Sequence, residues 1–200
     1  MPAEQLHGQV ELLLGHSGSG KTHLLQSRLG QLERIGGRLT PRFIVWDTKP
    51  DGYHAALPAA ALYDDVREFL SSVAENGEWG RVVLQAPDWQ LETLLEFAYR
   101  CGSMAIVIEE IDHWCTSSAA PEWLTEALRR GRSRGLTIIC TSQRCAEVPK
   151  MLTNRCDAVV LMAGAGREPR DAEYIARRWG QHTLDLLREL EPYTFLRVAS

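Results

Sequence analysis

The stretch LLLGHSGSGKTHLLQS, residues 12–27, constrains the fold more than any other part of the chain. An apolar run is followed by three glycines among small polar residues, then by a Lys–Thr pair and a new apolar pattern. Glycine allows the tight backbone turn that such a loop needs. Residues 15–22 fit the pattern G-x-x-x-x-G-K-[ST], and the flanking apolar runs predict the strand and the helix between which this pattern lies.

The glycine-rich segment predicts a binding site for a nucleoside triphosphate. Its glycines let backbone N–H groups turn inward onto the phosphates, and the helix that follows adds the positive end of its dipole. Lys21 then reaches the β- and γ-phosphates, and the hydroxyl of Thr22 helps to hold Mg²⁺. The predicted nucleotide-binding residues are Gly15, His16, Ser17, Gly18, Ser19, Gly20, Lys21 and Thr22.

Short apolar runs alternate with helical patterns along the whole chain. Such runs, bounded by Gly, Pro or charge, are typical of strands buried on both faces of a parallel sheet. The alternation predicts a doubly wound α/β fold, a single domain over residues 1–200 with a parallel-dominated sheet flanked by helices on both faces. Asp64, Asp88 and Pro121 are candidate helix starts. The predicted strands are 10–15, 42–47, 81–86, 104–110, 136–142, 157–162 and 193–198; the predicted helices lie near 20–35, 64–75, 88–100, 121–130, 168–179 and 183–190; the most loop-like segments are 49–61 and 163–169.

The composition is that of an ordinary soluble globular protein, with 44% hydrophobic and 24% charged residues. The net charge of −4 gives no sign of a nucleic-acid partner, although a pore or groove needs only a local basic surface. The five cysteines are scattered without a CxxC pair, which predicts free thiols in a reducing compartment. The polar N-terminus is unlike a signal peptide, and no apolar run is long enough to span a bilayer. We therefore expect a cytoplasmic protein, or one inside a particle assembled in the cytoplasm.

Two carboxylates, Glu109 and Glu110, end the apolar run MAIVIEE at residues 104–110. In P-loop proteins an acid at the end of the strand next to the loop binds the metal, and a second acid can deprotonate the attacking water. We therefore expect Glu109 to support Mg²⁺ and Glu110 to act as the base. The usual metal-binding acid is Asp, so Asp112 is the alternative to Glu109.

A pair of acids suited to activating water favours nucleotide hydrolysis coupled to motion over transfer of the phosphate to a substrate. GTPases need a guanine-reading NKxD and ABC-type ATPases an LSGGQ signature, and the sequence contains neither. A small-molecule P-loop kinase, which needs a substrate hydroxyl and a lid, stays open as an alternative. Its activity would not respond to DNA.

A local surplus of positive charge follows in the segment 128–155, which holds seven basic residues and one acid. These side chains can lie on a solvated helix face, reach the phosphates of a neighbouring subunit as an arginine finger, or contact a nucleic-acid backbone. Gln143 lies just past the predicted strand 136–142. There its amide can sense the γ-phosphate and the attacking water.

Taken together, these motifs resemble those of the HerA/FtsK superfamily of DNA-pumping ATPases. Besides the loop, FIVWDTKPDGY (43–53) is similar to the family's hydrophobic-D-P-K-G-E-Y, and IVIEE to its hhhDE. GRSRGLTIICTSQRCAEVPKMLTNRCDAVVL (131–161) is similar to GR-x-x-G-hhhhhATQRP…h…N…d, and LRELEPYTFLRV (187–198) resembles the closing L-x-x-L-P-x-G-x-h-hh segment. Residues 54–100 carry no match. The chain departs from the family pattern in Glu109 for Asp, in Cys145 where Pro follows the QR, and in DTKPDG for DPKG.

This resemblance implies a RecA/FtsK-like P-loop fold and a hexameric or pentameric ring that moves double-stranded DNA through a central channel. The segment 111–123, directly after the acidic pair, would transmit the nucleotide state to the DNA. The residues that the resemblance assigns are Lys21 and Thr22 for ATP–Mg²⁺, Glu109 for the metal, Glu110 for water activation, Gln143 for the γ-phosphate, and Arg132, with Arg129 and Arg134 in reserve, for a finger that reaches a neighbouring subunit.

The parts that the sequence lacks narrow the class of motor. Chromosome-partitioning and conjugative members carry membrane segments, and HerA-type helicases carry an N-terminal barrel for which there is no room before Gly15. The remainder resembles the genome-packaging ATPases of icosahedral viruses with an internal membrane, which pump DNA into a preformed capsid. Such a protein would dock on capsid-vertex or membrane proteins of the virion, in the host cytoplasm or on the virion. A cellular or plasmid-borne translocase with separate partner domains, and a phage-assembly ATPase of the zonular-occludens-toxin type, stay open.

Overall fold

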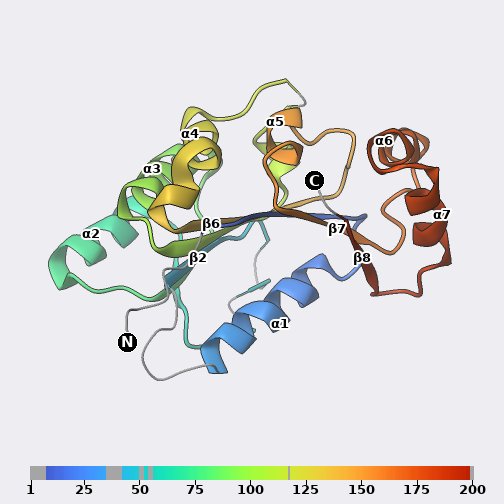
Figure 1. Ribbon diagram of the computed structural model, residues 1–200. Helices are drawn as coiled ribbons and strands as arrows, with labels where there is room; N and C mark the ends of the chain where they lie inside the picture. Colours follow the sequence, from blue (N-terminus) through green and yellow to red (C-terminus); the bar gives the residue numbers. More distant parts are fainter. Residues whose placement is uncertain (1–7, 35–41, 50–51, 54–55, 117, 199–200) are drawn as a thin grey trace, which may run out of the picture. The chain divides into compact units, whose positions relative to one another are not determined.

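The computed structural model describes residues 8–34, 42–49, 52–53, 56–116 and 118–198. In these residues the chain forms seven α-helices and one eight-stranded sheet with the strand order β3-β4-β2-β5-β6-β1-β7-β8 (Figure 1). The predicted α/β class is confirmed. The strands are β1 Val10–Leu14, β2 Arg42–Trp46, β3 Ala61–Tyr63, β4 Arg81–Leu84, β5 Met104–Ile108, β6 Leu136–Ser142, β7 Ala158–Met162 and β8 Phe195–Val198. The helices are α1 Lys21–Arg34, α2 Val66–Asn76, α3 Leu91–Cys101, α4 Glu122–Arg130, α5 Lys150–Thr153, α6 Pro169–Trp179 and α7 Gln181–Glu189.

The chain divides into two compact units, each built from segments that are far apart in the sequence. The first unit contains the residues before Val10, together with Thr22–Glu109 and Pro121–Ile138. The second unit contains Val10–Lys21, Glu110–Ala120 and Ile139–Ser200. Each unit is described on its own below, and a single domain over residues 1–200 stays a prediction.

In the first unit, β3, β4, β2 and β5 lie side by side and pair in parallel. Figure 1 shows α1 on one face of these strands and α3 and α4 on the other, as predicted. The residues of β5 are all buried, as expected for a strand covered on both faces. An aromatic cluster completes this core: Phe69 of α2 packs edge-on against Trp79 and Phe97, with ring centroids 5.7 and 5.4 Å away.

The helix starts of the first unit follow the capping rules, with one correction. Asp65, not the expected Asp64, caps α2, and its carboxylate accepts a backbone N–H of the first turn at 2.6 Å. Asp88 begins a short 3-10 helix, Asp88–Gln90, that leads into α3. Pro121 immediately precedes the first residue of α4, as expected.

In the second unit, β1 pairs in parallel with β7, and β8 runs antiparallel to β7 at the edge of the sheet. The sheet is therefore parallel-dominated, as predicted. Its central strands are apolar: β7 is buried over its whole length. The predicted loop at residues 163–169 is a run of turns that ends where α6 begins, and α7 follows α6 after Gly180.

Three local features differ from the prediction. The strand β3 begins at Ala61, the last residue of the segment 49–61 that was expected to be a loop, and two of its three residues are exposed. The helix α5 is a single turn after Pro149 and leaves no helical period in the sequence. The strand β5 ends at Ile108, so Glu109 and Glu110 follow the strand instead of ending it.

The prediction of free thiols is confirmed, because none of the five cysteines forms a disulfide. Four of them are buried, and Cys101 is exposed. Among the described helices, none combines the length and the apolar character needed to cross a bilayer.

Candidate functional site

The glycine-rich loop joins β1 to α1, which confirms the predicted strand–loop–helix arrangement. Gly18 and Gly20 have φ angles of 77° and 94°, a region that residues with a side chain rarely adopt. A Cβ atom on Gly15 would lie 2.7 Å from the side chains of Met162 and Ser19, closer than any real contact. The loop therefore needs glycine at these three positions, and its curled backbone can turn N–H groups toward a phosphate.

Lys21, the first residue of α1, keeps its ammonium group inside the loop. Its Nζ donates to the backbone oxygen of Gly15 at 2.5 Å and to that of His16 at 3.1 Å. Only 8% of the residue is exposed, so the charge depends on these oxygens for its solvation. A phosphate group is a stronger acceptor than a carbonyl oxygen, so Lys21 is positioned to exchange one for the other.

The end of β6 lies beside the start of the same loop. The N–H of Gly15 donates to the backbone oxygen of Ser142 at 3.2 Å, and Gln143 is the next residue. Gln143 in turn donates from Nε2 to Oε1 of Glu110 at 2.6 Å. The structure therefore brings together two of the residues that the sequence predicts for hydrolysis.

Glu110 is 6% exposed and is held from several directions. Its backbone N–H donates to Oγ1 of Thr141 at 3.1 Å, and Nε2 of His113 lies 3.5 Å from its Oε2. Its φ and ψ angles of 50° and 51° are left-handed, a conformation that costs a residue with a side chain about 1–3 kcal/mol and clusters at active sites. Glu110 therefore departs from the extended conformation of a strand.

Glu109, in the first unit, has a different set of partners. Its Oε1 accepts hydrogen bonds from Oγ1 of Thr22 at 2.9 Å and from the hydroxyl of Tyr53 at 3.0 Å. Burial raises the pKa of the Glu109 carboxyl above its ordinary value, and the hydrogen bonds from Thr22 and Tyr53 act in the opposite direction. Although Glu109 is one methylene longer than the usual Asp, its carboxylate is within hydrogen-bond distance of the Thr22 hydroxyl.

Thr22 and Glu109 form a donor set that fits Mg²⁺. A hydroxyl and a carboxylate supply hard oxygen ligands, and Mg²⁺ is usually held by one or two carboxylates together with water and substrate phosphates. Among the described residues there is no group of three or more His, Cys, Asp and Glu side chains suited to a metal, so the remaining ligands would be phosphate and water oxygens. Asp112, the predicted alternative to Glu109, lies in the second unit, in the 3-10 helix Ile111–His113, and its buried Oδ1 has no hydrogen-bond partner among the described residues.

Tyr53 is a site residue to which the sequence analysis assigns no role. It is fully buried, and burial, followed by the nearby Glu109 carboxylate, raises the pKa of its hydroxyl far above the ordinary value. The hydroxyl therefore stays protonated and donates to Glu109. The backbone N–H of Tyr53 donates to the carboxylate of Asp47 at 3.1 Å. The same carboxylate accepts from the backbone N–H of Lys49 and from the side chain of Gln85. The motif FIVWDTKPDGY was the available signal for this arrangement.

Replacing Tyr53 by Phe is expected to lower the free energy of unfolding at pH 8 by about 1.5–3 kcal/mol, because it removes a hydrogen bond to a buried carboxylate. The matched control is Tyr63→Phe, whose hydroxyl donates to the neutral Oγ of Ser72 at 3.2 Å. Its loss should cost about 0.5–1.5 kcal/mol. Urea unfolding followed by circular dichroism measures both variants, and equal losses would contradict the special role of the Glu109 contact.

The three candidate finger arginines lie in the first unit and are exposed. Arg134 donates from Nε and Nη2 to the backbone oxygens of Tyr99 and Arg100, both at 2.6 Å, and its guanidinium lies 5.0 Å from the centre of the Tyr99 ring. It therefore caps the C-terminal end of α3. Arg129 lies in the last turn of α4, and Arg132 lies in the 3-10 helix Gly131–Arg134 that follows.

The structure is similar to solved structures, whereas no family model and no curated protein sequence matches the chain. The genome packaging NTPase B204 from Sulfolobus turreted icosahedral virus 2, in complex with ATP-gammaS, matches with a TM-score of 0.76 over 96% of this chain and 92% of that chain, at 18% identity. B204 from Sulfolobus turreted icosahedral virus, described as a DNA-packaging ATPase, matches over the same shares with a TM-score of 0.72 at 16% identity.

A more distant match is the secretion protein EccC from Thermomonospora curvata. Its ATPases 2 and 3, in complex with a signal sequence peptide, match with a TM-score of 0.53 at 16% identity. The match covers 81% of this chain and 31% of that chain. At such identities a likeness concerns the fold, and for B204 it extends over nearly the whole of both chains. The fold expected from the resemblance to genome-packaging ATPases is therefore confirmed: this chain has the P-loop ATPase fold of B204.

Proposed function

We propose that this protein is an ATPase motor that moves double-stranded DNA, and that it packages a viral genome into a preformed capsid. The observation that carries the proposal is the 2.6 Å contact between Gln143 and Glu110, in the same unit as the phosphate loop. A buried carboxylate that is fixed by an amide is suited to orient and deprotonate a water molecule. The likeness in fold to B204, a DNA-packaging ATPase, supports the choice of this motor class.

In the proposed reaction, Lys21 exchanges its carbonyl partners for the β- and γ-phosphates of ATP, and the loop N–H groups hold the phosphates in place. Glu110 accepts a proton from water as the water oxygen forms a bond to the γ-phosphorus. The bond from that phosphorus to the bridging oxygen breaks, and ADP and inorganic phosphate result. Gln143 orients Glu110 and senses the γ-phosphate. Thr22 and Glu109 would hold Mg²⁺, which neutralises the charge that develops on the phosphates.

A ring of copies would complete the site, with an arginine of one subunit reaching the ATP of its neighbour. Arg132 is the proposed finger and Arg129 the reserve. Arg134 is the weakest candidate, because its guanidinium already binds the end of α3. Heterologous contacts between identical subunits form a ring when the rotation between neighbours closes, and such a ring fits a motor that encircles DNA.

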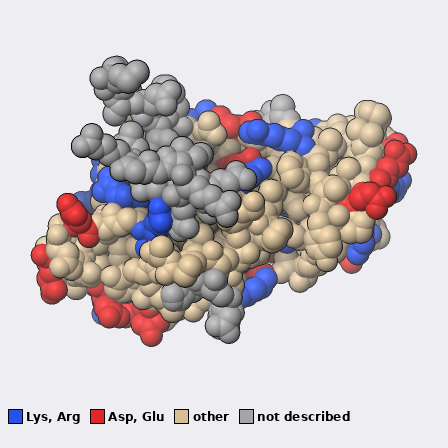
Figure 2. Space-filling view, turned by 90° about the horizontal axis from the view of Figure 1, so that it is seen from below, with Lys and Arg blue, Asp and Glu red and all other residues tan. Residues whose placement is uncertain are grey.

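The proposed DNA contacts are local and made to phosphates, since a pump must accept any sequence. On the face seen in Figure 2, Lys and Arg side chains of the described residues are interspersed with Asp and Glu. The described residues of this face show no large basic surface, so we assign the DNA contacts from the sequence. They lie in the basic segment 128–155 and in 111–123, where His113 and Trp114 follow the acidic pair. The proposed partners also include capsid-vertex or membrane proteins of the virion, and the proposed location is the host cytoplasm or the virion.

The test of the proposed function is ATP hydrolysis by the full chain with and without long double-stranded DNA. We expect severalfold stimulation that decreases steeply between about 50 and 200 mM salt, because phosphate contacts release counterions. The Lys21→Ala variant serves as the inactive control. A hydrolysis rate that is the same with and without DNA at low salt would contradict the proposed DNA motor. Transfer of the γ-phosphate to a small molecule would favour the alternative function, a small-molecule P-loop kinase.

A further inference from the structure

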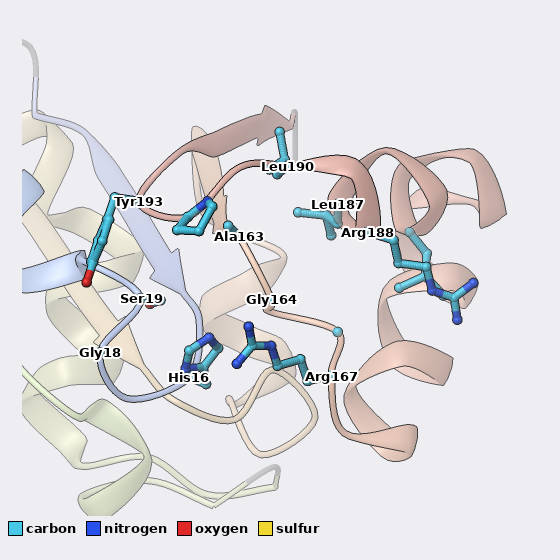
Figure 3. A pocket seen from close by; sticks show the side chains of 13 residues that line it. His16, Gly18, Ser19, Ala163, Gly164, Arg167, Leu187, Arg188, Leu190 and Tyr193 are labelled. Atoms are coloured by element: carbon cyan, nitrogen blue, oxygen red, sulfur yellow. The ribbon is translucent and has the colours of Figure 1, made fainter.

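A cavity of about 510 Å³ lies beside the phosphate loop in the second unit (Figure 3). Loop residues form one part of its wall, the turn after β7 forms another, and α7 with the segment before β8 forms the rest. Its size is within the range of cavities that bind small molecules. Of the loop residues in the wall, Ser19 is buried, and its Oγ has no hydrogen-bond partner among the described residues.

Tyr193 provides an aromatic wall on one side of this cavity. The residue is 73% exposed and has a left-handed φ of 66°, a conformation that a residue with a side chain rarely adopts. Figure 3 shows its ring beside Gly18 and Ser19. The ring also lies against the loop at Gly20, where an added Cβ would be only 3.1 Å from Cδ1 of Tyr193. An aromatic ring that is open to solvent at the edge of the phosphate loop offers a surface on which a planar group can stack.

Two basic side chains lie on the opposite side. Figure 3 shows His16 and Arg167 pointing toward one another. Both side chains lie close to Gly164: a Cβ atom added there would be 2.8 Å from Nε2 of His16 and 2.8 Å from Nε of Arg167. The Nδ1 atom of His16 is engaged with the backbone oxygen of Ser17 at 2.5 Å, so Nε2 is the atom on the cavity side.

The other lining residues that the structure describes include apolar side chains and carry no negative charge. Leu184, Leu187, Leu190 and Pro192 contribute apolar surface, and none of the described lining residues is acidic. Arg188 is not a ligand candidate: its guanidinium points away from the cavity in Figure 3, and its Nη1 lies 3.4 Å from Asp185. A cavity with one aromatic face, two basic side chains and several apolar side chains suits a flat heterocycle that is attached to an anion.

We propose that this cavity holds the nucleoside of the bound nucleotide, with its base stacked on Tyr193 and with Arg167 on the opposite side. The inference rests on the proposed function, because the loop must first hold the phosphates. The loop N–H groups cradle the α- and β-phosphates, so the sugar and base leave the loop from its edge. The cavity is lined by Gly18 and Ser19 at that edge, which makes it the space into which the nucleoside extends.

The experiment compares two ligands that share the phosphates and differ in the nucleoside. Binding of ATP and of inorganic tripolyphosphate, both with Mg²⁺, is measured by calorimetry for the wild-type chain and for Tyr193→Ala, Tyr193→Phe and Lys21→Ala. The control Phe195→Ala removes an exposed aromatic ring from β8 that does not line the cavity. We expect Tyr193→Ala to weaken ATP binding by about 5- to 150-fold, the range for loss of a stacked base, and to leave tripolyphosphate binding within about twofold. Tyr193→Phe and Phe195→Ala should bind both ligands as the wild type does.

The possible results separate the two proposals. If Tyr193→Ala binds ATP normally while Lys21→Ala binds neither ligand, the nucleoside assignment is wrong and the phosphate site stands. An equal loss of affinity for ATP and for tripolyphosphate would also overturn the assignment, because the Tyr193 ring would then support the conformation of the phosphate loop and not the base. If the wild-type chain binds neither ligand, the proposed function fails and the inference fails with it.

Discussion

Replacing Glu110 by Gln is expected to slow ATP hydrolysis by about 10²- to 10⁴-fold, the usual contribution of a general base. ATP binding should stay close to that of the wild type, because Glu110 contacts water in the proposed reaction and not the phosphates. Glu110 is only 6% exposed, and Gln has nearly the same shape as Glu, so the substitution keeps the packing around this side chain. Steady-state hydrolysis and calorimetric ATP titration of the same preparation separate the two effects.

The matched control for this variant is Glu173→Gln. Glu173 lies on α6 in the same unit and is exposed, so the control makes the same chemical change away from the phosphate loop. It should hydrolyse ATP at the wild-type rate. Full turnover by Glu110→Gln would show that another group accepts the proton, and Asp112, whose Oδ1 is buried without a partner among the described residues, would be the next acid to substitute.

The fold could be predicted from the sequence because most of its strands are buried on both faces. The five residues of β5 are all buried, so their apolar run is distinct in the sequence without any periodicity. The phosphate loop then fixes where the first strand ends and where α1 begins. By contrast, β3 is an edge strand of three residues, two of them exposed, and such a strand has the composition of a loop.

The candidate site could be predicted only where a local motif carries it. The loop 15–22 and the acidic pair are such motifs. The contact of Tyr53 with Glu109 joins residues 56 positions apart, and that of Gln143 with Glu110 joins residues 33 apart, so both depend on how the strands are ordered in the sheet. Each residue type was visible in the sequence, but its partner was not.

The candidate finger arginines also show that a local pattern does not reveal a side chain's partner. Spacing and charge alone give Arg129, Arg132 and Arg134 equal standing as fingers, because all three lie in one basic stretch. In the structure, Arg134 donates to two carbonyl oxygens that the end of α3 leaves without helical partners. Its role follows from the packing of α3, which no pattern within residues 128–155 encodes.

Replacing Lys21 by Ala is expected to weaken ATP binding by at least about 100-fold and to abolish hydrolysis, because the phosphates lose a buried, charge-assisted partner. The control is Lys150→Ala, which removes an exposed ammonium group of the same unit at the start of α5. That variant should bind ATP normally. Calorimetric titration measures both, and near-normal binding by Lys21→Ala would contradict the assignment of the phosphate site to residues 15–22.

The inactive Lys21→Ala chain also tests the shared site of the ring when it is mixed with Arg132→Ala. If Arg132 reaches the neighbour's ATP, each variant alone is inactive, but a mixed ring contains interfaces that pair an intact Lys21 with an intact Arg132. Random mixing in equal amounts makes about a quarter of the interfaces intact, so hydrolysis should recover toward that fraction of the wild-type rate. Two inactive variants that stay inactive when mixed would contradict a finger at Arg132, and the same mixture with Arg129→Ala would then test the exposed arginine in the last turn of α4.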